Sequence, residues 1–271
     1  MLTEVGQANT IAVVGAAAGI GAATAQRLIS AGHRVIGVDV RDADITCDLG
    51  TDAGRRAAVA RVSGRAHGVL DGLVQAPWAS PIGGGLAGAG VISRNYFGTI
   101  ALLEGLRPAL ARSDHAAVVV GTAWSGRVSH WPVELERLCL AGDEDRARKL
   151  SATIDAVSAL GASAAALARY VRRHALAPDW LGAGIRLNTV VPGFTDPPRL
   201  GDDLNDDQAV LDLERFRIVA ETVAARIVFL LGPEARALWR SAFDVGPRHV
   251  FDLVPAGAGS LVDAHSGGRP S

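Results

Sequence analysis

Residues 11–40 read IAVVGAAAGIGAATAQRLISAGHRVIGVDV, and their pattern predicts the architecture of the chain. A β-branched run ends at Gly15, apolar residues follow at helical spacing from Gly19 to Ser30, and a second apolar run closes the stretch. A strand, a helix and a strand within about 30 residues form a βαβ unit, whose two strands are parallel. The chain therefore opens with one unit of an α/β sheet.

The same alternation of strand and helix continues through the rest of the chain. Further strands are predicted at 45–49, 69–74, 116–121, 185–191 and 241–245. Helices are predicted at 51–62, 91–112, 157–174 and 213–231, with two helical stretches in 131–156 that meet near Ala141-Gly142-Asp143. We predict one domain over residues 1–254, a Rossmann-type, doubly wound parallel sheet of about seven strands flanked by helices. The Gly-, Ser- and Pro-rich residues 255–271 are expected to form a mobile tail.

Composition excludes several classes of protein. Hydrophobic residues make up 49% of the 271 and charged residues 20%, which suits a large buried core. A formal net charge of −1 offers no basic field for nucleic acid or an anionic membrane, and no run approaches the roughly 18 apolar residues of a transmembrane helix. The first ten residues lack signal-peptide features, two cysteines cannot form a disulfide framework, and no His, Cys or Asp cluster has metal-ligand spacing. We expect a cytoplasmic protein without a metal.

The glycine-rich turn after the first strand indicates a dinucleotide site. Gly15 permits the tight turn, Gly19 lets the backbone approach a pyrophosphate, and Gly21 lets the helix pack against the sheet. Ala18 and Ile20 complete the turn, and the amino end of the helix then offers N–H groups to the phosphates. The alternative is an ordinary Ala- and Gly-rich turn that binds nothing.

Asp39, at the end of the second strand, indicates which dinucleotide binds. Its carboxylate can accept hydrogen bonds from both hydroxyls of the adenosine ribose and would repel a 2′-phosphate. The sequence therefore favours NAD(H) over NADP(H), although Arg41 lies just beyond. Asp48 and Leu49, at the end of the predicted third strand, are expected to flank the adenine ring.

These residues resemble the short-chain dehydrogenase/reductase family, whose glycine motif is G-x-x-x-G-x-G. The likeness covers about residues 8–250 and is strongest to its bacterial 3α-hydroxysteroid dehydrogenase/carbonyl reductases. It is carried by GHRVIGVDVRDA (32–43), CDLGTDAGR (47–55), NYFG (95–98) and GIRLNTVVPG (184–193). That group also resembles this chain in an extended segment before the catalytic helix, here about 125–154, which suggests a role in covering substrate or in subunit packing.

The resemblance implies a catalytic set of Asn, Ser, Tyr and Lys that this chain keeps only in part. In the family, the Tyr hydroxyl exchanges a proton as hydride moves, and the Lys lowers the Tyr pKa from about 10. Residue by residue, the Asn falls on Asn95, the Ser on Thr122, the Tyr on Leu160 and the Lys on Ala164. Of the Y-x-x-S-K pattern only Ser163 remains polar. We therefore expect conventional hydride transfer to be impaired.

No Tyr-x-x-x-Lys exists elsewhere, and the nearest pattern is Tyr170 with His174. Ten residues of helix separate Tyr170 from position 160, a rise of about 15 Å, so we interpret both as structural or surface residues.

The resemblance also implies further cofactor contacts around the nicotinamide end. Ala76-Pro77-Trp78 replaces the family's N-A-G turn, so that Ala76 stays a cofactor contact while Pro77 removes a backbone N–H. Pro192, Gly193 and Thr195 follow the sixth strand and are expected near the carboxamide.

The extended segment and its surroundings hold substitute groups. His130 could act as acid or base near neutral pH, or be an exposed loop histidine. Glu134 and Glu136 could also belong to a roof over the pocket, but we interpret them as a solvated helix face. Other candidates are the possible roof residues Ser125 and Trp131, the loop residue Asp196, and the tryptophans Trp78 and Trp124, which could form an aromatic wall with Trp131 or simply belong to the core.

Three functions remain open from the sequence. The first is an atypical family member that binds NAD(H) and a hydrophobic alcohol or ketone of steroid, terpene or polyketide type, with protons handled by Thr122, water and a group such as His130. The second is a non-catalytic NAD-binding partner or sensor, and the third an ordinary oxidoreductase with a substitute proton donor. The resemblance implies that the protein forms a homo-oligomer, and we favour a dimer.

Overall fold

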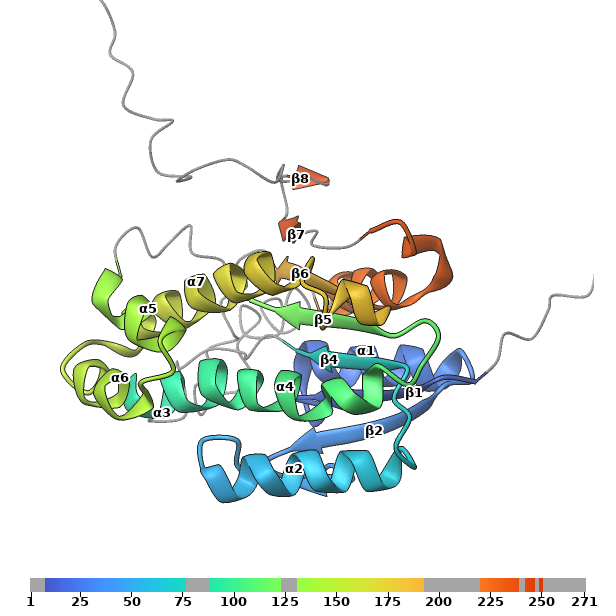
Figure 1. The fold of residues 1–271 in the computed structure, drawn as a ribbon, viewed down its shortest axis with the longest axis horizontal. Helices are drawn as coiled ribbons and strands as arrows, with labels where there is room; N and C mark the ends of the chain where they lie inside the picture. The colour runs from blue at the N-terminus through green and yellow to red at the C-terminus, as the bar shows by residue number, and fades with distance from the viewer. Residues whose placement is uncertain are drawn as a thin grey trace, which may run out of the picture.

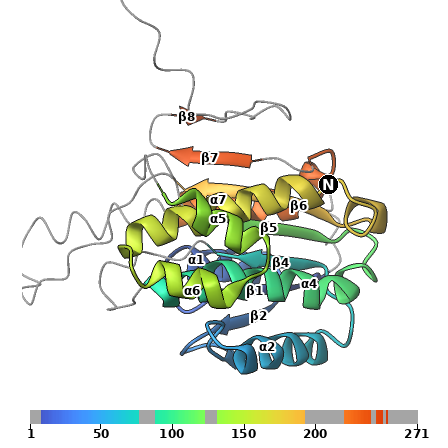
Figure 2. The same ribbon diagram turned by 60° about the vertical axis from the view of Figure 1, so that its left-hand side comes forward.

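The computed structural model describes residues 8–76, 88–122, 131–192 and 220–238, together with the backbone of 242–246 and 249–250. Its strands form one sheet in the order β3-β2-β1-β4-β5-β6-β7-β8 (Figures 1 and 2). The strand bounds are Thr10–Val14 (β1), Arg34–Asp39 (β2), Ile45–Thr46 (β3), Gly72–Gln75 (β4), Ala117–Gly121 (β5), Arg186–Pro192 (β6), Ala242–Gly246 (β7) and His249–Val250 (β8). The first seven are parallel and β8 runs antiparallel to β7, so the described sheet has eight strands where about seven were predicted.

Helices cover both faces of this sheet because neighbouring residues of each strand are buried on opposite sides. Ala12 and Val14 pack against α2 (Asp52–Arg65), α4 (Thr99–Leu110) and α7 (Ala156–His174). Ile11 and Val13 pack on the other face against α1 (Gly19–Ser30) and the helical residues 220–231. Figure 1 shows α2, α4 and α7 in front of the sheet and α1 behind it. The predicted doubly wound architecture is thus confirmed.

The extended segment forms two short helices outside the front layer. They are α5 (Val133–Leu140) and α6 (Glu144–Ser151), which pack on α7 and on α3 (Gly88–Ile92), respectively (Figure 1). Gly142, with φ of 74°, separates them, and the Asp143 side chain caps α6, so the predicted break at Ala141-Gly142-Asp143 is confirmed.

Two predicted elements differ from the structure, and two are described in part or not at all. The helix predicted at 91–112 is divided into α3, a π-helical turn at Ser93–Gly98, and α4. The third strand ends at Thr46 and not at Leu49, because Asp48 folds back to accept a hydrogen bond from the Gly50 N–H at 2.8 Å. The last long helix is described only from residue 220, and the predicted tail at 255–271 lies outside the described residues.

Candidate active site

The glycine turn lies at the carboxyl end of β1, where the strand order reverses between β1 and β4. Gly15 has φ of +81°, a conformation that costs a side-chain-bearing residue steric strain. A Cβ on Gly21 would lie 1.9 Å from the Gly15 carbonyl oxygen, so only glycine fits there. α1 begins at Gly19 with no side-chain cap on its first N–H groups. The turn therefore has the geometry of an anion site at a topological switch point.

Asp39 connects this turn to the end of β2. One carboxylate oxygen accepts the Ala17 N–H at 3.0 Å, and the other accepts the Val40 N–H at 2.6 Å. Each carboxylate oxygen can accept a second hydrogen bond. The side chain is only partly buried, so it remains open to a ligand that lies over the turn.

Asp48 is engaged by a partner that the sequence did not suggest. Arg94 grips it with two hydrogen bonds, from Nε at 2.8 Å and from a terminal nitrogen at 3.0 Å. These hydrogen bonds hold the pKa of the Asp48 carboxyl below its usual range, because they stabilise the ionised form. Asp48 thus fixes the π-helical turn against the loop before α2, and it does not end the third strand.

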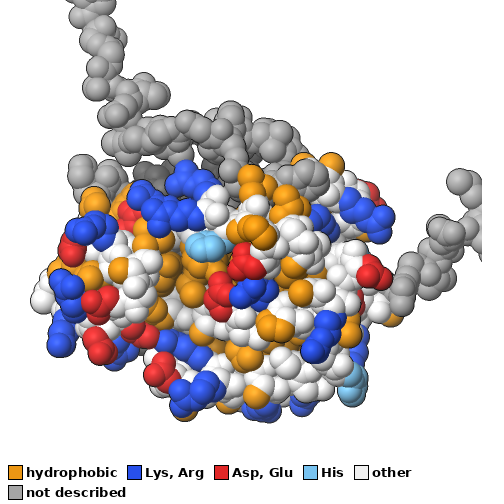
Figure 3. Space-filling model, in the orientation of Figure 1, with side chains coloured by type: hydrophobic (Ala, Val, Ile, Leu, Met, Phe, Trp, Pro, Cys, Tyr) orange, Lys and Arg blue, Asp and Glu red, His pale blue; other side chains and the backbone are white. Residues whose placement is uncertain are grey.

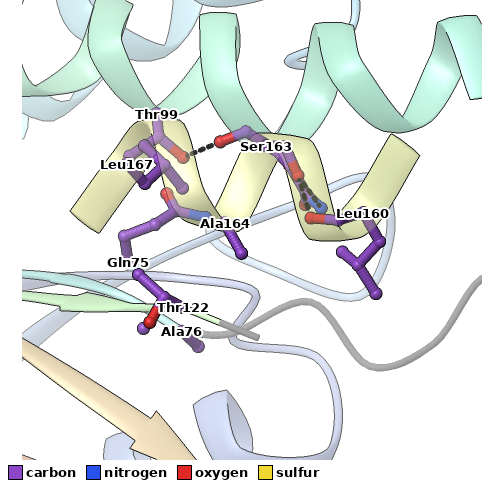
Figure 4. A pocket seen from close by; sticks show the side chains of 10 residues that line it. Gln75, Ala76, Thr99, Thr122, Leu160, Ser163, Ala164 and Leu167 are labelled. Atoms are coloured by element: carbon purple, nitrogen blue, oxygen red, sulfur yellow. Dashed lines mark hydrogen bonds between the residues drawn. The ribbon is translucent and has the colours of Figure 1, made fainter. Parts of the chain in front are cut away.

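A small cavity lies where the carboxyl ends of β4 and β5 meet α7 (Figure 4). It has room of about 20 Å³ for water centres, close to the size that holds one water. Its polar lining comes from Gln75, Asn95, Thr99, Thr122 and Ser163, and its remaining lining from Ala76, Gly121, Leu160, Ala164 and Leu167. None of these described lining residues carries an ionisable side chain.

The π-helical turn places Asn95 at this cavity. The turn interrupts the regular helix, and the Thr99 hydroxyl donates to the Asn95 carbonyl oxygen at 2.5 Å. The Asn95 side-chain amide then reaches the Ser163 hydroxyl at 3.4 Å, and that hydroxyl donates to the Leu160 carbonyl oxygen at 2.8 Å. Asn95 is therefore held against α7 by the irregular turn, a feature that often marks functional sites.

α7 presents Leu160 and Ala164 to the same cavity, since residues four apart share one face of a helix. Thr122 follows β5 and faces them from the opposite wall (Figure 4). The structure thus brings together Asn95, Thr122, Leu160 and Ala164, the four positions that the family resemblance selected, and two of them are apolar.

None of the phenol and amine groups of the described residues lines this cavity. Tyr96 is buried and packs edge-on against the Phe97 ring. Tyr170 donates its hydroxyl to Glu104 on α4 and stacks on His174, with ring centroids 4.0 Å apart. Burial and the Glu104 carboxylate raise the pKa of Tyr170, so it is a poor acid. Lys149, the only lysine in the sequence, is exposed on α6. The interpretation of Tyr170 as a structural residue agrees with this geometry.

One expectation about the extended segment is wrong. Glu136 is buried at 4% exposure and does not lie on a solvated face. It accepts a hydrogen bond from Trp131 Nε1 at 3.1 Å and lies 2.9 Å from Arg169 Nε on α7. Glu134, in contrast, is on the exposed side and pairs with Arg137. Glu136 therefore anchors α5 to α7.

Several predicted site residues lie outside the described part of the chain. They are Trp78, Trp124, Ser125, His130, Gly193, Thr195 and Asp196. Pro192 is described and ends β6. No helix among the described residues is long and apolar enough to cross a bilayer, and no group of three or more potential ligands among them could hold a metal.

Gln75 is a lining residue that the sequence analysis missed. It ends β4 with only 6% of its surface exposed. The sequence signal that could have found it is a polar residue at the carboxyl end of an apolar strand, because α/β proteins bind ligands at the carboxyl ends of their strands.

No family model matches this chain, but individual relatives and solved structures match most of its length. A 3-alpha-hydroxysteroid dehydrogenase/carbonyl reductase of Comamonas testosteroni is 35% identical over 240 residues, which are 84% of this chain and 91% of that protein. The crystal structure of 3-alpha-hydroxysteroid dehydrogenase from Pseudomonas sp. B-0831, complexed with NADH, matches with a TM-score of 0.73 and 36% identity, covering 88% of this chain and 95% of that one. A short chain dehydrogenase/reductase from Brucella ovis shares the fold, with a TM-score of 0.62, 23% identity, and coverage of 88% and 100%.

Proposed function

Because this chain belongs to the short-chain dehydrogenase/reductase family, we propose that it binds NAD(H) and a small hydrophobic alcohol or ketone, and that the ordinary hydride-transfer chemistry of the family is impaired in it. The observation that carries the proposal is the cavity at the carboxyl ends of β4 and β5. Leu160 and Ala164 line it, and no ionisable side chain does so among the described residues.

NAD(H) binding is supported by the other half of the site. A dinucleotide's pyrophosphate would contact the glycine turn and the uncapped start of α1, and its adenosine ribose would contact the partly exposed Asp39 carboxylate. A relative at 36% identity was crystallised with NADH. Asp39 would repel a 2′-phosphate, which favours NAD(H) over NADP(H).

The chemistry of the cavity limits the reaction that a bound ketone can undergo. Bound NADH supplies a hydride to a carbonyl carbon. The carbonyl oxygen then needs a hydrogen-bond donor that can release a proton, and here it would meet the Thr122 hydroxyl and the Asn95 amide. Neither group is a good acid, and the loss of a positioned general acid slows such steps by about 10²- to 10⁴-fold. Thr122 can still orient a carbonyl, and His130, outside the described residues, stays a candidate donor.

The apolar lining also supports the class of ligand. Leu160 and Leu167 line one side of the cavity. The cavity admits only a group of hydroxyl or carbonyl size, so the hydrocarbon body of such an alcohol or ketone would lie outside it, beyond these apolar side chains. The names of two relatives include a hydroxysteroid, which is consistent with that class. The described lining holds no ionisable side chain. This observation also favours a second candidate function, that of a non-catalytic NAD-binding partner or sensor.

Calorimetry combined with turnover tests the proposal. We expect saturable NADH binding, weaker NADPH binding, and NADH consumption on a panel of steroid and aliphatic ketones at least about 100-fold slower than by the Comamonas relative assayed in parallel. Binding without any turnover would favour the sensor. Turnover at the relative's rate would refute impaired catalysis, and absence of NADH binding would refute the proposal as a whole.

A further inference from the structure

Gln75 is a buried polar residue that lines the cavity. The catalytic set implied by the family resemblance assigns it no role. Gln75 is the last residue of β4 and pairs in register with Val14 of β1 and Val120 of β5. The sheet therefore fixes its backbone on both sides. Figure 4 shows its side chain extending from the strand end toward α7, beside Ala164 and Leu167.

The carboxamide oxygen of Gln75 has no hydrogen-bond partner among the described residues, although it is buried. Burial of an amide oxygen without a donor is unfavourable, so a purely structural glutamine would be expected to pair both ends of its amide. An unpaired acceptor at a cavity is instead complementary to a donor that enters from outside.

The size of the cavity restricts that donor. The room of about 20 Å³ suits one water or one hydroxyl group. Ala164, the α7 residue beside Gln75, has no polar side chain that could compete for such a hydroxyl. A compact donor on a larger ligand, with the rest of that ligand outside the cavity, fits this geometry.

The sheet order indicates which part of a dinucleotide lies here. The glycine turn follows β1, and Asp39 ends β2 on one side of the switch point. The adenosine half therefore extends over β1 and β2, and the other half extends over β4 and β5, where Gln75 and Thr122 lie. The nearest sugar hydroxyls on that side belong to the nicotinamide ribose.

We infer that the Gln75 carboxamide oxygen accepts a hydrogen bond from a hydroxyl of the nicotinamide ribose, which makes Gln75 a positioning residue for the reactive half of the cofactor. This inference rests on the proposed function, because it requires that NAD(H) binds. It adds a residue that neither the glycine motif nor the catalytic set includes.

The test compares Gln75→Met with Gln26→Met, which makes the same chemical change on the exposed face of α1. Calorimetry measures binding of ADP, ADP-ribose and NADH, of which only the last two carry the second ribose. For Gln75→Met we expect Kd for ADP-ribose and NADH to rise about tenfold and Kd for ADP to stay unchanged. Because the methionine removes an unpaired acceptor, the Tm of the free protein should not fall. Gln26→Met should leave all four values unchanged.

Other results distinguish failure of this inference from failure of the proposed function. If Gln75→Met binds ADP-ribose as tightly as the parent does, the assignment to the ribose is wrong. This holds even if the variant binds NADH more weakly. Equal weakening of all three ligands with a lower Tm would show a structural role and overturn the inference. If the unmodified protein binds none of the three ligands, the proposed function itself fails.

Discussion

Asp39 combines a structural and a proposed binding role in one carboxylate. Its oxygens hold the Ala17 and Val40 N–H groups and so shape the glycine turn. Each oxygen can still accept a second hydrogen bond, which we propose comes from the hydroxyls of the adenosine ribose. A substitution there should therefore change cofactor preference and not only affinity.

We expect Asp39→Asn to weaken NADH binding about tenfold and NADPH binding less, since repulsion of the 2′-phosphate is lost with the charge. Asp42→Asn, in the same loop with a side chain 84% exposed, is the matched control and should change neither affinity. Fluorescence titration of both cofactors measures the ratio. Equal losses for NADH and NADPH would contradict the assignment of Asp39 to the ribose.

Leu160 and Ala164 allow the missing chemistry to be restored. The double variant Leu160→Tyr, Ala164→Lys would introduce a phenol and an ammonium on one face of α7 beside Asn95 and Thr122. We expect ketone reduction to increase by about 10²- to 10⁴-fold, with a pH dependence that reports the new phenol. Steady-state assays with NADH measure it.

Leu160→Phe, Ala164→Met controls for side-chain bulk in that experiment and should gain nothing. A double variant that binds NADH as tightly as the parent but stays inactive would show that more than these two groups is missing.

At the scale of residues, sequence patterns predicted what depends on local chemistry. The glycine turn needs a positive φ and close packing at fixed spacing, so Gly15, Gly21 and Asp39 could be located from the sequence alone. The partners of Asp48 and Glu136 could not, because tertiary packing brings Arg94 to the loop that holds Asp48 and Arg169 of α7 to Glu136 of α5. Gln75 was missed because its burial becomes evident only once β1 and β5 lie on either side of it.

Among the elements, α6 is joined to α2 and to the π-helical turn by a buried guanidinium, in addition to its packing on α3. Arg55 on α2 reaches the Glu144 carboxylate with contacts of 2.5 and 2.7 Å, and donates to the carbonyl oxygens of Leu49 and Ser93. It thereby joins the loop before α2, the π-helical turn and the start of α6. Helical periodicity predicted each helix but contains no information on this long-range contact.

Glu144 makes this junction sensitive to acid. Its burial acts to raise its pKa, but hydrogen bonds from Arg55 and Ser93 and nearby positive charges outweigh that effect and lower the pKa below its ordinary 4.5. A lowered folded-state pKa means that the stabilisation is complete above pH 4.5 and is lost as the pH falls through the folded value.

We expect Glu144→Gln to lower the free energy of unfolding by about 2 kcal/mol at pH 7, with the difference from the parent shrinking in acid. Urea unfolding at several pH values measures this. Glu134→Gln, at the exposed pair with Arg137, should cost less than about 0.5 kcal/mol. A difference from the parent that stays constant down to pH 3 would refute the role of the charge.

On the scale of the whole molecule, α5 and α6 cover part of the surface of α7 and α3, which a second copy could otherwise contact. The face with α2, α4 and α7 shows apolar side chains interspersed with charged ones (Figure 3). Part of the α7 surface is covered by the chain's own α5 through Arg169 and Glu136. We therefore expect a homodimer and no tetramer. Sedimentation velocity over a range of concentrations measures this, and a monomer or a tetramer throughout would contradict it.

A crystal structure of the protein with saturating NADH is the most direct test of a site that binds the dinucleotide but lacks the catalytic phenol and ammonium. We expect pyrophosphate density on the glycine turn, the nicotinamide above the ends of β4 and β5, and no tyrosine hydroxyl or lysine ammonium within about 4 Å of the nicotinamide C4 atom. A phenol or ammonium group found at that distance would contradict this expectation, and so would a glycine turn without cofactor density.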